Sequence, residues 1–222
     1  MSEETNQAIA KQLRQPSGDE AVDVGNRMNT GNLFMNLVTI ESLSLSPNDS
    51  LLEIGMGNGF FVHHLFESEP MIKYVGYDYS EKMVEESEKM NADLIAEGKA
   101  TFELGDISAT KFEDAAFNHI FTVNTIYFWD DVQSTINEIK RILKVGGSLT
   151  ISIRPKEIMD SFPYTRHGFT TYNPVELATL LNENGFEITK VHVQTEADLD
   201  FFGEVLRNEF AVIQGVLMNY EI

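Results

Sequence analysis

Short apolar runs alternate with amphipathic helical stretches from residue 50 onward, and this alternation is the strongest pattern in the chain. The apolar runs that predict strands cover residues 51–54, 72–77, 101–104, 117–123 and 148–153. Apolar residues recur every three or four positions in the segments between them, which predicts helices over 60–66, 80–97 and 131–143. Strands that alternate with helices in this way form a parallel sheet covered by helices on both faces.

The last fifty residues depart from strict alternation. Pro174 suits the first position of a helix and Gly185 suits its end, so a helix is expected between them. Two further strands are predicted over 186–193 and 209–217, with a helix over 197–206 between them. Because no further crossover unit follows these two strands, they indicate one antiparallel edge strand. The expected fold is therefore α/β, with a seven-stranded and mostly parallel sheet.

The first 45 residues read as a helical arm, ahead of a main domain over 46–222. A helix is expected over 4–14, followed by a turn-rich tract that begins at Gln15 and extends to about Asn26. A second helix is expected from Thr30 or Asn32 to Leu43, where apolar residues recur at helical spacing.

Charge and cysteine content exclude several classes of function. The chain has 16 Lys and Arg against 35 Asp and Glu, a net charge of −19, which disfavours nucleic acids and anionic membrane surfaces as partners. It has no cysteine, so disulfides, thiolate nucleophiles and cysteine metal sites are excluded. The polar, acidic start and the lack of a run of about 18 apolar residues predict a cytoplasmic protein that does not insert into membranes.

A glycine-rich loop at residues 53–59 is the sharpest motif. It lies between a predicted strand and a predicted helix, where alternating glycines let the backbone approach a ligand. The G-x-G-x-x-G spacing of dinucleotide enzymes fails, because Phe60 stands three positions after Gly57. Asp78 follows the loop by about 20 residues, at the place where a carboxylate can accept hydrogen bonds from two ribose hydroxyls.

At these residues the chain resembles the class I S-adenosylmethionine-dependent methyltransferases. The matching blocks are residues 51–59, 76–80, 105–107, 123–129 and 143–149. They occur in the family's order, and the tail fits its final reversed strand pair. The resemblance implies a Rossmann-like fold, S-adenosylmethionine as cofactor and S-adenosylhomocysteine as product. Within the family, the chain is most similar to the small-molecule branch that resembles quinone-biosynthesis C-methyltransferases.

The resemblance also implies a set of cofactor-binding residues. They are Glu53, Gly55, Gly57, Gly59, Asp78, Tyr79, Met83, Asp106, Ile107, Asn124 and Thr125. Asp78 would hold the ribose, and Asp106 with the Ile107 backbone would hold the adenine. Asn124 and Thr125 would lie near the sulfonium and the methionine amine. Met83 fits a core position equally well, because methionine at helical spacing is common in cores.

The acceptor side is less defined by the sequence. Tyr127 and His167 are the candidate catalytic residues, and the candidate substrate-binding residues are Arg14, Arg27, Trp129 and Tyr164. Each has a simpler alternative: a solvated loop histidine, exposed arginines, and aromatic rings that only pack. No metal site is predicted, because the adjacent His63 and His64 point in different directions on a helix.

The function expected from the sequence is in-line transfer of a methyl group to a small-molecule acceptor, with catalysis mainly by positioning. Carbon, oxygen and nitrogen acceptors all stay open, as do the monomeric and homodimeric states. An alternative is a regulatory or scaffold protein that binds S-adenosylmethionine without turnover. A nicotinamide dehydrogenase is a third hypothesis, weakened by the glycine spacing.

Overall fold

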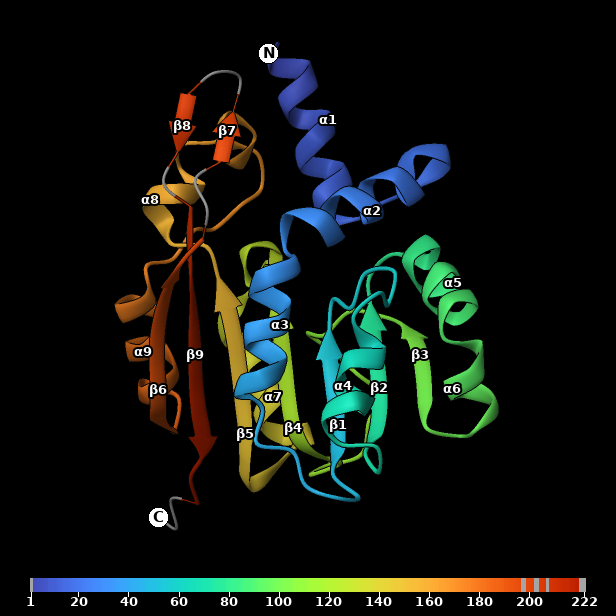
Figure 1. The fold of residues 1–222 in the computed structure, drawn as a ribbon. Coiled ribbons are helices and arrows are strands. Elements are labelled where there is room, and N and C mark those ends of the chain that lie inside the picture. The colour runs from blue at the N-terminus through green and yellow to red at the C-terminus, as the bar shows by residue number, and fades with distance from the viewer. Residues whose placement is uncertain (1, 197–198, 202–203, 207, 220–222) are drawn as a thin grey trace.

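A seven-stranded sheet forms the centre of the molecule, in the order β3-β2-β1-β4-β5-β9-β6 (Figure 1). The computed structural model describes residues 2–196, 199–201, 204–206 and 208–219. The strands are β1 (Ser50–Ile54), β2 (Lys73–Asp78), β3 (Ala100–Leu104), β4 (Phe117–Val123), β5 (Leu143–Ile153), β6 (Phe186–Thr195) and β9 (Glu209–Leu217). The expected α/β fold is confirmed. The antiparallel strand is β9, which lies between β5 and the edge strand β6 and runs opposite to both.

Helices cover both faces of the sheet, because its central strands are apolar on both sides. The helices of the main domain are α4 (Val62–Ser68), α5 (Glu81–Met90), α6 (Ala92–Ala96), α7 (Val132–Ile142), α8 (Lys156–Met159) and α9 (Pro174–Glu183). The neighbours Leu51 and Leu52 of β1 are both fully buried, in hydrophobic clusters on opposite faces. Leu51 packs in the cluster that contains Leu65 of α4, and Leu52 in the cluster that contains Ile136 of α7.

Three N-terminal helices precede the sheet: α1 (Glu3–Arg14), α2 (Ala21–Gly31) and α3 (Leu33–Ser42). Figure 1 shows α3 against one face of the sheet, with α1 and α2 beyond the carboxyl ends of the parallel strands. The expected turn-rich tract to Asn26 is wrong from residue 18, where a short 3-10 turn leads into α2. Ala21 and Gly25 are the buried residues of α2, and Gly25 lies beside Met83 of α5. This packing stabilises a helix whose own apolar pattern is weak.

The helix predicted over 197–206 is also wrong. The structure has two short antiparallel strands here, β7 (Leu199–Phe201) and β8 (Glu204–Leu206), while residues 197–198 and 202–203 of the predicted helix lie outside the described part. The alternation of apolar and acidic residues at Leu199, Asp200 and Phe201 has the two-residue period of a strand.

The helix predicted over 80–97 is interrupted at Asn91, between α5 and α6. The Asn91 side chain is fully buried, and its Nδ2 donates to the carbonyls of Gly59 (3.1 Å) and Ser87 (2.9 Å). An asparagine side chain that bonds the backbone competes with helix continuation. Because the Asn91 side chain bonds both Gly59 and Ser87, it connects the glycine loop to α5 at this interruption.

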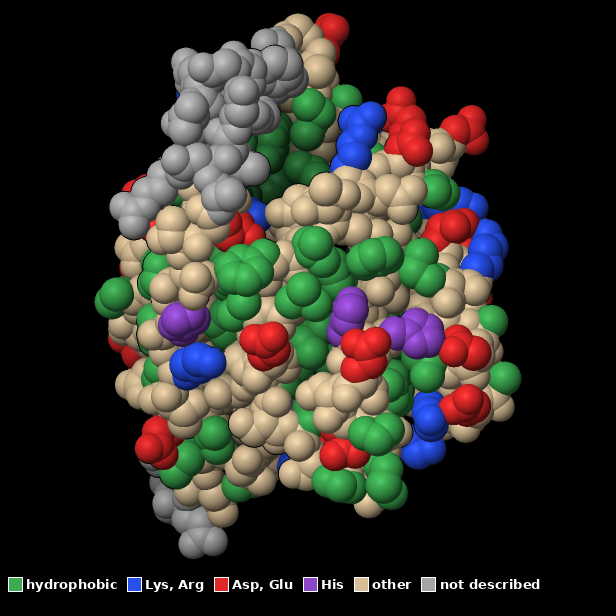
Figure 2. Space-filling model, viewed as in Figure 1, with side chains coloured by type: hydrophobic (Ala, Val, Ile, Leu, Met, Phe, Trp, Pro, Cys, Tyr) green, Lys and Arg blue, Asp and Glu red, His purple; other side chains and the backbone are tan. Residues whose placement is uncertain are grey.

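The surface seen from the α3 side is mixed. Figure 2 shows hydrophobic side chains in the middle of this face, over α3, with acidic side chains spread around them. Leu33 and Phe34 of α3 are 44% and 45% exposed. None of the described helices is long and apolar enough to cross a membrane.

Candidate active site

The three glycines of the loop after β1 are needed for different structural reasons. All three have positive φ: +73° at Gly55, +58° at Gly57 and +71° at Gly59. A Cβ at Gly55 would lie 2.2 Å from Cγ2 of Thr125, and a Cβ at Gly59 would lie 2.7 Å from Nδ2 of Asn91. A Cβ at Gly57 would meet nothing within 4 Å. The loop therefore packs at its two ends and leaves open space at its middle glycine.

Asp78 ends β2 directly beside this loop. Its Oδ2 accepts from the Gly57 N–H at 3.0 Å and its Oδ1 accepts from the Ser80 N–H at 2.8 Å. Burial raises the pKa of this carboxyl group to about 6, although the backbone donors oppose the shift. Each carboxylate oxygen keeps a second lone pair, so the group can still accept from a vicinal diol.

Glu53 lies in β1 and does not line the cavity. Its side chain is buried, and its Oε2 accepts from the hydroxyl of Tyr74 at 2.6 Å. Burial raises the pKa of Glu53 to about 7, and the nearby charge of Asp78 adds to this rise. Two carboxyl groups with raised pKa values thus lie under and beside the glycine loop, a pattern common at functional sites.

A cavity of about 140 Å³ opens at the carboxyl ends of β1, β2 and β4 and extends under the N-terminal helices. Its lining includes eleven of the residues predicted for the site. They are Arg14, Gly55, Gly57, Asp78, Tyr79, Met83, Asp106, Ile107, Asn124, Thr125 and Trp129. This is the place where open α/β sheets bind ligands, so one cavity brings together most of the predicted cofactor residues and two of the predicted substrate residues.

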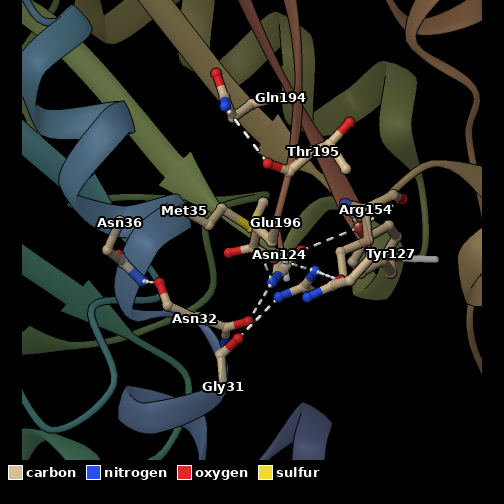
Figure 3. Close-up of polar contacts among 11 residues, drawn as sticks. Gly31, Asn32, Met35, Asn36, Asn124, Tyr127, Arg154, Gln194, Thr195 and Glu196 are labelled. Carbon is tan, nitrogen blue, oxygen red and sulfur yellow. Dashed lines mark hydrogen bonds and ion pairs between the residues drawn. The ribbon is translucent and has the colours of Figure 1, made fainter. Parts of the chain in front are cut away.

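Two amide side chains that line the cavity contact each other: Asn124, directly after β4, and Asn32, between α2 and α3 (Figure 3). Asn124 adopts a left-handed backbone conformation, with φ of +58°, which asparagine tolerates better than most residues. Its Nδ2 donates to Oδ1 of Asn32 at 3.0 Å, and its Oδ1 lies 3.0 Å from the Tyr127 hydroxyl donor. Asn124 is therefore held from both sides.

Neither predicted catalytic residue lines the cavity. Tyr127 is 2% exposed, its hydroxyl contacts Asn124 and the Arg154 backbone, and burial raises its pKa well above the ordinary value. His167 lies at the contact with α1, where its Nε2 is 3.4 Å from Oε1 of Glu3.

Three other predicted site residues also lie elsewhere. Gly59 packs against α5, as described above. Arg27 is on α2, in a separate shallow depression with Asp23 and Thr30. Tyr164 stacks on Phe162, with ring centroids 5.4 Å apart.

Sequence analysis missed several residues of the cavity wall. Leu13, Pro16, Met28, Asn32 and Phe128 line it in addition to the predicted set. Four of them come from the N-terminal arm, whose placement over the strand ends no local pattern reveals. Gly105 also belongs to this wall, and its residue type is a signal that the sequence does contain. A Cβ there would lie 1.8 Å from the Tyr77 hydroxyl, so only glycine fits this part of the wall.

The comparisons with known proteins agree with this geometry. A family model described as a methyltransferase domain matches residues 45–198. The chain belongs to the methyltransferase family. Its structural neighbours place it among the class I S-adenosylmethionine-dependent methyltransferases. Among the residues that the structure describes, no cluster of three or more His, Cys, Asp or Glu residues could hold a metal ion.

Several named methyltransferases are similar to this one. An uncharacterized methyltransferase of Bacillus subtilis, YdaC, is 29% identical over 57% of the chain and 67% of its own length. The 27-O-demethylrifamycin SV methyltransferase of Amycolatopsis mediterranei is 27% identical over 49% of the chain and 40% of its own length. The matched part of the chain thus spans about two thirds of the length of YdaC and 40% of the length of the rifamycin methyltransferase.

A solved structure from Thermotoga maritima is similar over most of the chain. It is a SAM-dependent methyltransferase named as a possible histamine N-methyltransferase. It has a TM-score of 0.64 and 26% identity, and covers 88% of this chain and 95% of that one.

Replacing Gly59 by alanine should destabilise this methyltransferase by roughly 3 kcal/mol, from left-handed strain plus overpacking against α5. Gly98→Ala is the matched control, because Gly98 also has positive φ (+65°) but has no atom within 4 Å of the added Cβ. The control should lose only about 1 kcal/mol. Urea unfolding of both variants measures the difference, and equal losses would contradict a packing role for Gly59.

Glu53→Gln should change how stability depends on pH. Because the folded state raises the pKa of Glu53 from 4.5 to about 7, ionisation of this group favours unfolding as the pH rises through that window. The wild type should lose roughly 3 kcal/mol relative to Glu53→Gln between pH 4.5 and 8. Unfolding of the ligand-free proteins at several pH values tests this. Glu113→Gln, at an exposed position, should show no such trend.

Proposed function

We propose that this protein transfers a methyl group from S-adenosylmethionine to a small-molecule acceptor. The observation that carries the proposal is one cavity in which a buried carboxylate, Asp78, lies beside the open space over Gly57. A vicinal ribose diol needs two acceptor lone pairs, and a close-lying ligand needs a loop position without a side chain. These residues fit the ribose and methionine parts of the cofactor.

Each residue of the cavity then has a role in binding. Asp78 accepts from the ribose hydroxyls, and Asp106 lies where the adenine amino group would be held. Tyr79 and Met83 flank the adenosine, and Asn124 and Thr125 lie toward the methionine end. Glu53 and Gly59 support the loop from beneath. When bound, the cofactor supplies an electrophilic methyl group on a positively charged sulfur.

The protein's contribution to methyl transfer is positioning and exclusion of water. Holding an acceptor in line with the methyl group can account for roughly 7–11 kcal/mol of the barrier. Tyr127 and His167 stay candidates for proton transfer only as sequence predictions, since neither lines the cavity. The proposal therefore relies on an acceptor that reaches the site as a competent nucleophile.

The acceptor side of the cavity has an apolar character. Leu13, Met28, Phe128 and Trp129 line it, and the one arginine among the described residues that line the cavity, Arg14, is already paired with a carboxylate. Such a wall favours an acceptor with an apolar body over a polyanion. The names of the rifamycin and histamine methyltransferases above agree with small-molecule acceptors.

We also propose that residues 1–45 act as a lid on a main domain formed by 46–222. The end of α1 and the two residues after it are fastened on two sides of the cavity. Arg14 makes a bidentate ion pair with Asp130, with N–O distances of 3.0 and 2.6 Å. On the other side, Gln15 Nε2 donates to the Tyr79 carbonyl at 3.0 Å and the Ser80 hydroxyl donates to the Pro16 carbonyl at 2.5 Å. Ligand exchange would need some of these contacts to open.

The test of cofactor binding uses Trp129, the one tryptophan of the chain, which lines the cavity. Titration with S-adenosylhomocysteine should change its fluorescence, and Asp78→Asn should weaken binding by about 10- to 100-fold, since hydrogen bonds to charged groups contribute roughly 1.5–3 kcal/mol. Wild-type affinity should also fall as the pH drops through about 6, where Asp78 gains a proton.

The controls for this titration are Asp93→Asn, at an exposed position in α6, and NADH as ligand. Asp93→Asn should bind like the wild type, and NADH should not bind. Binding of NADH instead of S-adenosylhomocysteine would overturn the assignment. Transfer of radiolabelled methyl groups to a panel of small amines, phenols and carbon acids then separates an enzyme from a binding protein without turnover.

Removing the Arg14–Asp130 pair should speed ligand release. Arg14→Met should raise the dissociation rate of S-adenosylhomocysteine by about two- to fivefold, the small effect expected of a partly exposed ion pair. Stopped-flow fluorescence of Trp129 measures this rate. Lys82→Met removes the exposed pair with Glu85 (2.8 Å) on α5 and should leave the rate unchanged. An unchanged rate in Arg14→Met would contradict the lid.

A further inference from the structure

Arg154 is a buried cation directly after β5, and it joins three segments that are far apart in the sequence. Its Nη1 donates to Oε2 of Glu196 at 2.8 Å and also contacts Oδ1 of Asn208, and its Nη2 donates to the carbonyl of Gly31 at 2.8 Å (Figure 3). The side chains of Arg154 and Glu196 are only 8% and 9% exposed. Burying two charges is costly, and such a pair often stabilises a fold no better than apolar residues would.

The contacts of Arg154 lie at defined places in the fold. Gly31 ends α2, Glu196 follows β6, and Asn208 precedes β9. The N–H of Glu196 donates to the carbonyl of Asn208 at 2.8 Å, so these two residues close the base of the excursion that carries β7 and β8. One guanidinium group therefore attaches the end of α2, and the base of the segment that carries β7 and β8, to the end of β5.

The backbone of Arg154 leads from this ion pair to the cavity. Its N–H donates to the Tyr127 hydroxyl at 2.6 Å, and that hydroxyl lies 3.0 Å from Oδ1 of Asn124. Asn124 Nδ2 donates to Asn32, the residue that follows Gly31. The contacts thus form a closed ring through Arg154, Gly31, Asn32, Asn124 and Tyr127. Two members of this ring, Asn32 and Asn124, line the cavity.

We propose that Arg154 is a positioning residue whose buried pair with Glu196 sets the two cavity amides of Asn32 and Asn124. This inference rests on the proposed methyltransferase function. The guanidinium holds the end of α2 at the distance at which Asn32 accepts from Asn124, and the Arg154 backbone orients Tyr127 on the other side of Asn124. The one Tyr127 hydroxyl proton has two acceptors at 3.0 Å, Oδ1 of Asn124 and the Arg154 carbonyl, and it orients the Asn124 amide when it points to the first of them. The raised pKa of Tyr127 keeps the hydroxyl a donor at every pH where the enzyme would be assayed.

The test compares Arg154→Lys with the wild-type full-length chain. Lysine keeps the positive charge beside Glu196, but one ammonium group cannot reproduce the planar fork that reaches Glu196, Asn208 and Gly31 together. The variant should fold, as judged by circular dichroism. Its side-chain amide NMR signals from Asn32 and Asn124 should shift and broaden in the ligand-free protein, and its affinity for S-adenosylhomocysteine should fall on the order of tenfold.

Arg141→Lys is the matched control. Arg141 also binds two carboxylates, Glu138 at 2.7 Å and Asp114 at 2.6 Å, but it does not line the cavity or contact the ring. This variant changes an arginine with two carboxylate partners in the same way and should keep both amide signals and the affinity. Amide signals and affinity that stay at wild-type values in Arg154→Lys would overturn the proposal.

A double variant, Arg154→Met with Glu196→Leu, separates positioning from stability. It removes both buried charges, so its thermal midpoint should equal or exceed that of Arg154→Lys. The carbonyl of Gly31 still lacks its donor, so the amide signals and the affinity should not recover. If the thermal midpoint, the amide signals and the affinity all returned to wild-type values, the pair would only stabilise the fold, and the proposed positioning role of Arg154 would be overturned.

The two proposals fail in different ways. The amide signals are read without ligand, so they test the role of Arg154 even if the wild type does not bind S-adenosylhomocysteine. Absence of wild-type binding would overturn the proposed function alone. Wild-type binding with unperturbed amides in Arg154→Lys would overturn the role of Arg154 alone.

Discussion

The carboxylate of Asp78 joins the two loops that form the cradle at the bottom of the cavity. It accepts from Gly57 in the loop after β1 and from Ser80 at the start of α5, so one side chain sets the distance between two loops from neighbouring strands. This arrangement keeps a carboxyl group in a buried place, where its pKa is raised to about 6. Glu53 pairs in the β1–β2 register with Gly76, two residues before Asp78, and adds a second buried carboxyl group. The cradle therefore has an electrostatic cost in the ligand-free protein, which a positively charged ligand would relieve.

The second half of the site comes from outside the sheet. The arm supplies Leu13, Arg14, Pro16, Met28 and Asn32 to the cavity. Its attachment near the cavity includes several polar contacts: an ion pair to Asp130, a bond to the Tyr79 carbonyl and the contact of Gly31 with Arg154. Polar attachments are directional and break singly, whereas an apolar interface would bind the arm without fixing its angle. They are the kind of attachment that the proposed lid would need, since it must hold one geometry and still let a ligand pass.

Most of the cavity wall that comes from the sheet was predictable from the sequence because its residues follow strands at short, regular distances. Gly55, Gly57, Asp78 and Asp106 each stand directly after an apolar run, and parallel strands bring such positions to one edge. The acceptor side was not predictable in this way. Tyr127 was predicted to face the reaction but is buried against Arg154, and Arg27 was predicted to bind substrate but lies in a separate depression. Both predictions depended on how the segment after β4 and the N-terminal arm lie in space, which the local pattern of apolar residues does not indicate.

The sequence by itself determined the alternation of strands and helices, the turn at each glycine and the placement of acidic residues at strand ends, because these depend on neighbours within a few positions. Only the tertiary structure decided that Gly59 and Asn91 pack together, that residues 199–201 and 204–206 form paired strands in place of a helix, and that the arm lines the cavity. The ring through Arg154, Asn124 and Asn32 is the clearest case. Its members are separated by up to 123 residues along the chain, and their hydrogen bonds form only after the sheet and the arm have brought them into contact.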